Sequence, residues 1–519
     1  MADRDGPTAA TVSSPDLLRA ARGARVVQAL LEAALWAIAA GSVLAFGSVH
    51  AWAYPVLWVA CFVAAGIAAL RAAVVSGLRQ RLGPHRVALH VSGRWLVIEP
   101  HPADRALGWS IDLGEPSFPR GSLLLPGLVF LAFVLLQLVP VAGGPATLDP
   151  EATRRGITFV LAFLLLHEAA GAAFAHHAAR RRFRKMLAWL GAAIALVALG
   201  QLASGTKLVY GFFESLEGGH PYGPFVNRNH FAGYMLLVLP VALGLLADAW
   251  RAYARRVGDN PTARRSLLSL QTREGTRLVY AALPPFLGIG ALLASTSRGG
   301  ILAFFAALAL AAAGVRSRRG TPAWAAALVF AAVALTWFGL ERLEVRFLRT
   351  TDDAPGRTVV WRESIASLHG SRWVTGYGFD AFAEALSRVP AWTLPAGATP
   401  WPRAAEAALL SGARVGYRAP GDLPGLVWYR EAHSDYVQLL VETGVPGLLI
   451  GLWAALAALA AARRDPWLFA ALAGLLMHVF VDFDLQIPAI AALFVVLAAM
   501  RPGRQRGGDP DSRRVPEAA

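Results

Sequence analysis

The chain has 519 residues, of which 56% are hydrophobic and 16% charged, with a formal net charge of +15. A soluble domain has no use for this much apolar surface, so the composition indicates a multi-pass membrane protein. Basic residues are expected to flank apolar spans on one side of a bilayer, and the lack of a soluble basic domain argues against nucleic-acid binding. The single cysteine, Cys61, excludes an internal disulfide framework.

Residues 1–25 are predicted to form a cytoplasmic N-terminal tail, which ends with Arg19, Arg22 and Arg25. The apolar stretch that follows, 26–47, is longer than the core of about 7–15 residues found in a signal peptide. It is therefore predicted to be an uncleaved first transmembrane helix.

Twelve apolar stretches come close to the roughly 20 residues that a helix needs to cross a bilayer. The predicted fold class is therefore an all-α polytopic membrane protein, with nine spans within 26–340 and three within 434–501. The predicted spans are 26–47, 53–75, 122–141, 156–177, 186–204, 230–250, 278–295, 299–315, 322–340, 436–462, 466–482 and 487–501.

Short connections rich in arginine mark the cytoplasmic side of a membrane protein. An orientation with both termini in the cytoplasm puts five such connections on that side: 180–185, 250–277, 315–320, 462–465 and 501–506. The opposite turns, 47–55 and 481–488, contain no Arg or Lys. Arg154 and Arg155 are the exception, because this orientation puts them on the outer side.

Two long segments between spans are not apolar enough to cross the membrane. Residues 76–121 are predicted to be a cytoplasmic loop, and the alternation of apolar and polar residues within 85–100 favours a small β-hairpin. Residues 341–433 are predicted to form an extracytoplasmic loop domain, whose many Trp, Phe and Leu residues argue against disorder. Residues 502–519 are predicted to be a disordered cytoplasmic tail.

The unusual polar motifs all fall on the outer side of the predicted membrane. They are GGHPYGPFVNRNHFAGY (218–234), STSRGG (295–300), GRTVVWRESIASLHGSRWVTGYGFDAF (356–382), EAHSDYVQLLVETG (431–444) and DFDLQIP (482–488). Polar and ionisable residues gathered at one face of a membrane protein indicate a functional site there. This convergence is a stronger indication than any single motif.

Three arginines in these motifs are candidates for binding an anion. Arg298 lies in a short turn between apolar helices, where a guanidinium needs an anionic partner or reaches lipid headgroups. Arg357 lies near the expected start of a helix, and guanidinium groups bind phosphate through two parallel hydrogen bonds. Arg362 would lie on a different face of that helix, and a salt bridge with a neighbouring acidic residue is an equal alternative for it.

His433 is the candidate general base, because an unperturbed histidine titrates at about pH 6.5. The alternative is a histidine that only faces headgroups at a helix start, where Ser434 or Asp435 would be the N-cap. Glu442 follows at a depth where a carboxylate needs a partner, although a regular helix puts it on the opposite face from His433. Asp435 and Glu442 are taken as candidate substrate-binding residues.

Asn227, Arg228 and Asn229 precede a predicted span on the outer side. The two asparagines are either turn formers or binders of sugar hydroxyls, and all three residues are candidates for substrate binding. The sequence shows no clustered acidic ligands of the kind that hold Mg²⁺ or Mn²⁺, so neither a metal nor another cofactor is expected.

Eight segments, in this order, resemble the superfamily of O-antigen ligases and polymerases, which act on bacterial envelope glycans. The segments are FGSVHAWA (46–53), LQLVPV (136–141), GPFVNRNHFAGYM (223–235), TSRGG (296–300), GRTVVW (356–361), GYGFDAF (376–382), AHSDYVQLLVETGVPGLL (432–449) and DFDLQIP (482–488). The family's outer-turn arginine falls on Arg298, its loop arginine on Arg357 and its histidine on His433. Ser434 departs from the Asn that is usual after this histidine.

The resemblance implies an enzyme of the bacterial inner membrane that needs no nucleotide sugar. Its donor would be a glycan on a polyprenyl diphosphate, and its acceptor a hydroxyl of a glycolipid, glycan or protein at the outer face of the bilayer. Arg298 and Arg357, with Arg362 in reserve, would stabilise the departing diphosphate, and His433 would deprotonate the acceptor.

The resemblance leaves several reactions open. An O-antigen ligase is favoured, followed by a polymerase and then a protein O-oligosaccharyltransferase. A polytopic transporter is the alternative from another class. It is disfavoured because transporters tend to put their polar residues near the membrane midplane, whereas this chain gathers them at one interface.

Overall fold

The computed structural model describes most of the chain, with gaps. The described residues are 15–82, 87–91, 94–99, 110–112, 122–141, 144–175, 177–213, 221–258, 262–314, 357, 360–362, 364–387 and 431–500. The predicted span 322–340, the tail 502–519 and most of the predicted loop domain 341–433 lie outside these residues.

Apolar α-helices make up almost all of the described chain. Seven of them are long and apolar enough to cross a membrane: α1 (Pro15–Leu44), α2 (Ala53–Leu82), α4 (Pro150–Ala173), α5 (His177–Ser204), α6 (Arg228–Val257), α8 (Arg273–Ala294) and α16 (Asp435–Ala462). Four are apolar but shorter: α3 (Leu124–Gln137), α9 (Arg298–Gly314), α17 (Pro466–His478) and α18 (Pro488–Ala498). The protein is therefore a multi-pass, all-α membrane protein.

The predicted spans coincide with these helices in position, but several of the helices are shorter than a full span. Eleven of the twelve predicted spans overlap an α-helix of the described chain, and the remaining one, 322–340, is not described. Because only seven described helices have the length and apolarity of a full span, the predicted number of twelve is not confirmed. Helix α1 also begins at Pro15 rather than at 26, so Arg19, Arg22 and Arg25 lie inside its first turns.

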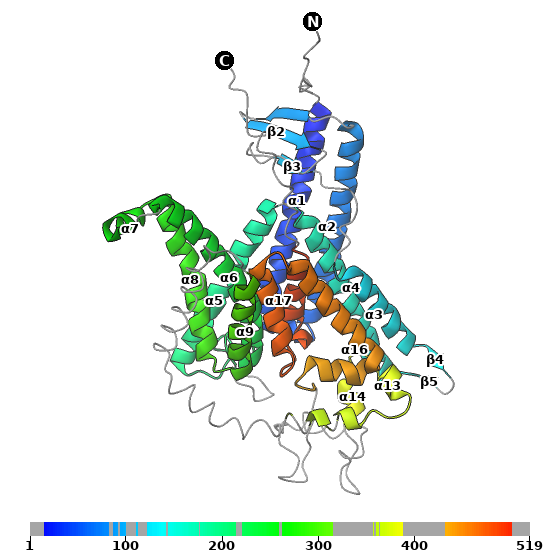
Figure 1. Ribbon diagram of the computed structural model, residues 1–519. Helices are drawn as coiled ribbons and strands as arrows, with labels where there is room; N and C mark the ends of the chain where they lie inside the picture. Colours follow the sequence, from blue (N-terminus) through cyan, green and yellow to red (C-terminus); the bar gives the residue numbers. More distant parts are fainter. Residues whose placement is uncertain are drawn as a thin grey trace.

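The predicted β-hairpin is confirmed. Strands β1 (Val87–Val91) and β2 (Arg94–Glu99) pair antiparallel, with Val91 opposite Arg94, and β3 (Ser110–Asp112) adds to β2 in parallel. Figure 1 shows this small sheet beside the N-terminal part of α1, at the end of the molecule where α1 begins and α2 ends. A second, two-residue pair, β4 (Pro140–Val141) and β5 (Gly144–Pro145), follows α3 at the other end.

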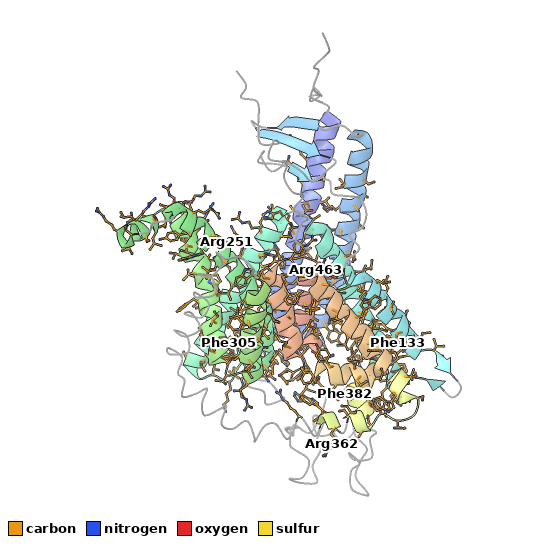
Figure 2. The ribbon with its side chains drawn as sticks, viewed as in Figure 1. Phe133, Arg251, Phe305, Arg362, Phe382 and Arg463 are labelled. Atoms are coloured by element: carbon orange, nitrogen blue, oxygen red, sulfur yellow. The ribbon has the colours of Figure 1, made fainter. Side chains whose placement is uncertain are left out.

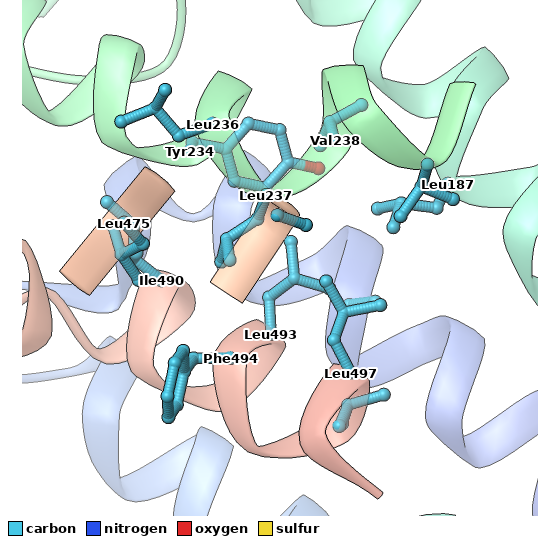
Figure 3. Close-up of a cluster of buried hydrophobic side chains, with 14 of the residues drawn as sticks. Leu187, Tyr234, Leu236, Leu237, Val238, Leu475, Ile490, Leu493, Phe494 and Leu497 are labelled. Atoms are coloured by element: carbon cyan, nitrogen blue, oxygen red, sulfur yellow. The ribbon is translucent and has the colours of Figure 1, made fainter. Parts of the chain in front are cut away.

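Helix α6 forms the centre of the bundle. Of its most apolar 18-residue window, 94% is buried, because α5, α8, α9 and α17 all pack against it. Figure 3 shows part of this core, where Leu237 of α6 lies toward Leu493 of α18. A well-buried central helix fixes the position of the residues at its ends, of which the N-terminal ones belong to the site described below.

Small residues let the neighbouring helices approach α6 closely, as is usual in membrane bundles. A Cβ atom on Gly191 of α5 would lie 2.4 Å from Val238, and a Cβ on Gly288 of α8 would lie 2.6 Å from Leu239. Larger side chains at these two positions would force the helices apart, so glycine is required there for packing.

Ion pairs tie α5 to its neighbours at the end of the bundle where α5 begins. There, Arg182 of α5 donates two hydrogen bonds of 2.8 and 2.7 Å to Glu32 of α1, and Arg184 pairs with Asp465. Figure 2 shows Arg251 and Arg463 toward this end, and Arg362 and Phe382 toward the opposite one. The arginines of the predicted loop 180–185 thus begin α5 and tie it to its neighbours.

Arg155, which breaks the arginine rule for orientation, has a local partner. It lies near the start of α4, and its Nε is 2.7 Å from Asp380 Oδ2. Thr153 of the same turn donates a hydrogen bond of 3.0 Å to the carbonyl of Phe379. The first turn of α4 therefore holds the segment 376–382, which explains a basic residue at this end of the bundle.

Candidate active site

The turn between α17 and α18 is the point where the polar motifs meet. This turn, residues 479–487, contains a short 3-10 helix, η3 (Asp484–Gln486). Asp482 and Asp484 are 1% and 0% exposed. A buried carboxylate is costly unless hydrogen-bonding or charged groups compensate it, so the residues around these two carboxylates define the site.

Two histidines from different helices contact the Asp484 carboxylate. His230 Nδ1, in the first turn of α6, lies 3.2 Å from Asp484 Oδ1 and 3.9 Å from Asp482 Oδ1. His478 Nδ1, at the end of α17, lies 2.5 Å from Asp484 Oδ2. We call His230, His478, Asp482 and Asp484 the buried His–Asp cluster. It joins the ends of three helices through one carboxylate.

The backbone of α6 comes very close to this carboxylate. A Cβ on Gly233 would lie 2.3 Å from both Cγ and Oδ2 of Asp484, a distance at which no side chain fits. Gly233 lies three residues after His230, on the same face of the helix. Glycine at this position therefore lets Asp484 reach the histidine.

Arg357, which lies between α9 and α16 in the sequence, contacts the cluster. Its guanidinium donates a hydrogen bond to the carbonyl of Val481, and its Nη2 lies 3.5 Å from Asp482 Oδ2. Burial alone would raise the pKa of Asp482. Arg357 and the neighbouring histidines outweigh the burial and hold the pKa of this carboxyl below its usual range. Arg362, by contrast, is exposed.

The start of α9 lies against the same turn, and its first residue is Arg298. Arg298 comes two residues after Thr296, whose φ of 54° is unusual for a residue other than glycine. A Cβ on the next residue, Gly299, would lie 3.0 Å from Val481 and 3.2 Å from His478 Nε2. The first turn of α9 therefore rests directly on the turn that holds Arg357.

His433 packs against Phe483, which the His230 ring also contacts. The centroid of its ring is 5.1 Å from that of Phe483, and the His230 ring is 4.6 Å away from the same phenylalanine. Burial lowers the pKa of His433 to about 4; Asp482 opposes this shift, while Arg357 and His230 add to it. His433 is thus close enough to Arg357 and Asp482 to feel both charges.

The backbone on both sides of His433 is fixed. His433 has a φ of 53°, a conformation that costs energy for a residue with a side chain. The N–H of Ala432 donates to Gln438 Oε1 at 3.1 Å, and Trp361 Nε1 donates to the Ala432 carbonyl at 2.9 Å. These bonds hold the strained residue, and Trp361 links it to the helical segment that carries Arg357.

Ser434 and Asp435 have structural contacts in the site. Ser434 is the N-cap of α16, as one alternative in the sequence predicts, and its side chain accepts a hydrogen bond from the N–H of Val437. Asp435 accepts hydrogen bonds from the N–H of Leu485 at 2.9 Å and from Gln486 Nε2 at 3.3 Å. The Asp435 carboxylate therefore fixes the start of α16 to η3.

Glu442 points away from the cluster, toward the segment 376–382. Its carboxylate accepts a hydrogen bond of 3.1 Å from Gln438 Nε2 and backbone hydrogen bonds from Asp380 and Phe382. Its carbonyl accepts from Gly378 N at 2.9 Å, because α16 is interrupted at Gly444, where φ is 65°. Glu442 thus anchors the segment 376–382 to α16.

The asparagines before α6 act locally. Asn227 is the N-cap of α6, and its side chain accepts a hydrogen bond of 2.9 Å from the N–H of Asn229. Arg228 and Asn229 are half-buried in the first turn. One of the two alternatives, the turn former, therefore describes Asn227, and the same turn carries His230 into the buried His–Asp cluster.

The sequence interpretation used the three candidate catalytic residues but not the cluster beneath them. His478 stands alone in an apolar stretch, and His230 is the first residue of a predicted span; a lone histidine at such a position is ordinarily a core residue. The motif DFDLQIP contains both aspartates, but nothing in the spacing shows which groups they face. A titratable residue inside a predicted span was the available signal.

Among the described residues, one group has the types and spacing to hold a metal ion: His230, Asp482 and Asp484, whose ligand atoms lie within 4.8 Å of one another. Its carboxylates already have other partners. Arg357 lies against Asp482 and His478 against Asp484, so basic side chains compensate the charge that a cation would otherwise neutralise. We therefore interpret the cluster as a network of protein side chains.

The arrangement combines two chemical capacities around the turn 479–487. Arg357 contacts this turn and Arg298 begins the helix that rests on it, and guanidinium groups bind phosphate-like anions through paired hydrogen bonds. His433 brings an imidazole whose lowered pKa keeps it neutral, and a neutral imidazole can accept a proton. An anion and a hydroxyl are the groups that such a site suits best.

One comparison with protein families finds a match. Residues 285–452, from within α8 into α16, match the family model described as O-antigen ligase. Arg298, Arg357 and His433 all lie within this match, whereas the buried His–Asp cluster lies outside it. No curated protein matches the chain. This match supports the O-antigen ligase superfamily, a family that implies an enzyme transferring glycans.

Proposed function

We propose that the protein moves a glycan from a polyprenyl diphosphate to an acceptor hydroxyl at the outer face of the bacterial inner membrane. The observation that carries the proposal is the approach of three segments to one turn. Arg357 contacts Val481 and Asp482, the turn that begins with Arg298 rests on Val481, and His433 packs against Phe483. The domain boundaries and the cytoplasmic placement of both termini are part of this proposal.

The arginines have the role of stabilising the leaving group. When the anomeric C–O bond breaks, its electron pair goes to the diphosphate, which needs no protonation to depart. Positive charge placed where this negative charge develops lowers the barrier. Arg298 and Arg357 supply that charge, and the proposal therefore requires no metal ion and no other cofactor.

His433 has the role of the general base. The acceptor hydroxyl gives its proton to the imidazole as its oxygen forms the new bond to the anomeric carbon. The unliganded site holds the pKa of His433 to about 4, which makes it a weak base. A bound diphosphate brings negative charge close to the imidazole and raises its pKa, so proton acceptance becomes easier with the donor in place.

The remaining candidate residues have supporting roles in this proposal. The exposed guanidinium of Arg362 and the half-buried Arg228 and Asn229 stand where glycan hydroxyls or phosphate oxygens can reach them. Asp435 and Glu442 hold η3 and the segment 376–382, so we assign them to the shape of the substrate site rather than to direct contact.

The acceptor decides among three reactions. We favour ligation to a glycolipid acceptor such as lipid A-core, with extension of a lipid-linked glycan as the second possibility and transfer to protein as the third. The gathering of polar groups at one interface favours all three over transport, which places its binding residues near the midplane.

A deletion strain tests the function and separates the first two reactions. Loss of a ligase leaves long lipid-linked glycans that are not attached to an acceptor, whereas loss of a polymerase leaves lipid-linked single repeats. The control is the same strain carrying the intact gene. A deletion strain whose lipid-linked glycans and finished envelope glycans match those of the parent would contradict the proposal.

A further inference from the structure

His478 occupies an unusual position between a carboxylate and a helix start. It is the last residue of α17 and is 1% exposed. Its Nδ1 lies 2.5 Å from Asp484 Oδ2. The opposite edge of the ring faces α9, because a Cβ on Gly299 would lie 3.1 Å from its Cδ2 and 3.2 Å from its Nε2.

The first turn of α9 has little freedom to move relative to this ring. A Cβ on Gly300 would lie 2.5 Å from Ala232 of α6, so the backbone of α9 is in close contact on that side as well. Gly299 touches His478 and Val481 on the other side. The helix start that carries Arg298 is therefore wedged between α6 and the His478 ring.

Asp484 fixes the ring in turn. Its second oxygen accepts from His230, and the absence of a side chain at Gly233 brings it against α6. Two histidines on one carboxylate hold its orientation, and the orientation of the carboxylate holds the His478 ring. The chain of contacts runs from α6 through Asp484 and His478 to the residue next to Arg298.

We propose that His478 is a positioning residue: held by Asp484, it sets where α9 begins and thereby where the Arg298 guanidinium lies. The inference rests on the proposed role of Arg298 in binding the diphosphate. His478 itself needs no contact with the substrate. Its effect is exerted through the edge of the ring that carries Nε2, rather than through the hydrogen bond at Nδ1 alone.

Two substitutions separate the two edges of the ring. The amide of asparagine lies as many bonds from Cα as Nδ1, so His478→Asn keeps a donor for Asp484 but leaves a gap beside Gly299. The amide of glutamine lies as many bonds from Cα as Nε2, so His478→Gln keeps a group beside Gly299. A role confined to holding Asp484 predicts that Asn is tolerated better than Gln. Positioning of Arg298 predicts the reverse.

The activity test uses the full-length protein in membranes and the lipid-linked glycan that accumulates in the deletion strain. We expect His478→Asn to lower kcat by on the order of 10- to 100-fold, because a misplacement of about 1 Å at a reacting site has costs of that order. His478→Gln should retain most of the activity. In combination with Arg298→Lys, His478→Asn should cause little further loss, since both changes act through one guanidinium. Independent, multiplying losses would overturn the proposal.

Hydrogen exchange tests the positioning without any substrate. In the purified protein, backbone amides of residues 299–304 should exchange faster in His478→Asn than in the wild type, and at the wild-type rate in His478→Gln. Unchanged exchange in His478→Asn would overturn the positioning role, whatever the transfer assay shows. If the exchange result holds but the wild type transfers no glycan, the proposed function fails and the structural role of His478 stands.

His167 provides a matched control. It is a second fully buried histidine, whose Nδ1 lies 2.8 Å from the Val495 carbonyl and whose Nε2 lies 3.4 Å from Leu123 N, between α4, α18 and α3. His167→Gln should leave exchange at 299–304 unchanged. If it increases that exchange as His478→Asn does, the effect reflects general loosening of the bundle and contradicts a specific role for His478.

Discussion

At the scale of single residues, the site depends on side chains whose pKa values are shifted by burial and by neighbouring charges. His433 is buried beside a carboxylate and an arginine, and Asp482 lies beneath both. Burial disfavours the charged form of each: it prevails for His433, whereas the neighbouring positive charges outweigh it for Asp482. The site is therefore set to hold a neutral imidazole next to an ionised carboxylate and a guanidinium.

The pH dependence of kcat/KM should report the His433 imidazole of the free enzyme. Because burial holds its pKa to about 4, the imidazole is neutral above that pH and protonated, hence inactive as a base, below it. We therefore expect protonation of His433 to cause no fall in kcat/KM between about pH 8 and pH 5. A fall in kcat/KM with a midpoint at about pH 6.5, abolished in His433→Gln, would contradict the burial of this residue.

The hydrogen bond from Trp361 to the Ala432 carbonyl offers a second test at this scale. Trp361→Phe removes the N–H donor and keeps an aromatic ring, so the carbonyl beside the strained His433 loses its partner. We expect the free energy of unfolding to fall by about 1 kcal/mol. The fall in kcat should correspond to a larger free energy than this, since His433 is then less firmly held. Trp189→Phe, at an exposed position of α5, should change neither quantity. Equal kcat values for the two variants would argue against a role of Trp361 in the site.

At the scale of elements, the site is built from helix ends. The start of α6 supplies His230, and the end of α17 supplies His478. Arg298 is the first residue of α9, and His433 directly precedes Ser434, the N-cap of α16. Helix ends carry free backbone groups and are held by the packing of the whole helix. Glycines at the contact points allow these ends to meet.

Gly233 tests the packing of the helix ends. Gly233→Ala puts a Cβ at 2.3 Å from the Asp484 carboxylate, so α6 and η3 must separate. We expect a loss of about 1–3 kcal/mol in stability, as for other overpacked sites, together with a loss of transfer activity. Gly66→Ala in α2 is the control, because nothing lies within 4 Å of its added Cβ. Similar melting temperatures and activities for the two variants would contradict the close approach.

At the scale of the whole molecule, the two ends of the bundle are assigned to the two sides of the membrane. The end with the termini and the arginines of α5 is expected to face the cytoplasm, and the end with Ser371, η3 and His433 the exterior. This assignment is testable by labelling. In a Cys61→Ala background, a membrane-impermeant maleimide should label Ser371→Cys in intact cells and label Thr262→Cys only after the membrane is broken. The reverse pattern would contradict the proposed orientation.

The sequence predicts the larger features of this molecule well. Runs of apolar residues predict where the helices lie, and alternation around Ser92 and Gly93 predicts the β-hairpin, because both patterns are local. Helix lengths are less predictable: α17 ends at His478, where the turn toward Asp484 begins, although apolar residues continue to Val481.

The buried His–Asp cluster could not be predicted in the same way. His230 and Asp484 are 254 positions apart, and only the packing of α6 against η3 brings them within 3.2 Å. Glu442 is predicted to bind substrate because a carboxylate at its depth needs a partner, and Asp435 is also predicted to bind substrate. The structure supplies those partners from the chain itself: Gln438 for Glu442, and Leu485 for Asp435.

The central claim is that Arg298, Arg357 and His433 form one site for a diphosphate and a hydroxyl. The most direct measurement is glycan transfer by the reconstituted protein, with the lipid-linked glycan from the deletion strain as donor. Arg298→Lys and Arg357→Lys keep the charge but lose the paired donors, and His433→Ala loses the base, so each should lower kcat by on the order of 100-fold. Full transfer by Arg298→Lys and His433→Ala would contradict the account.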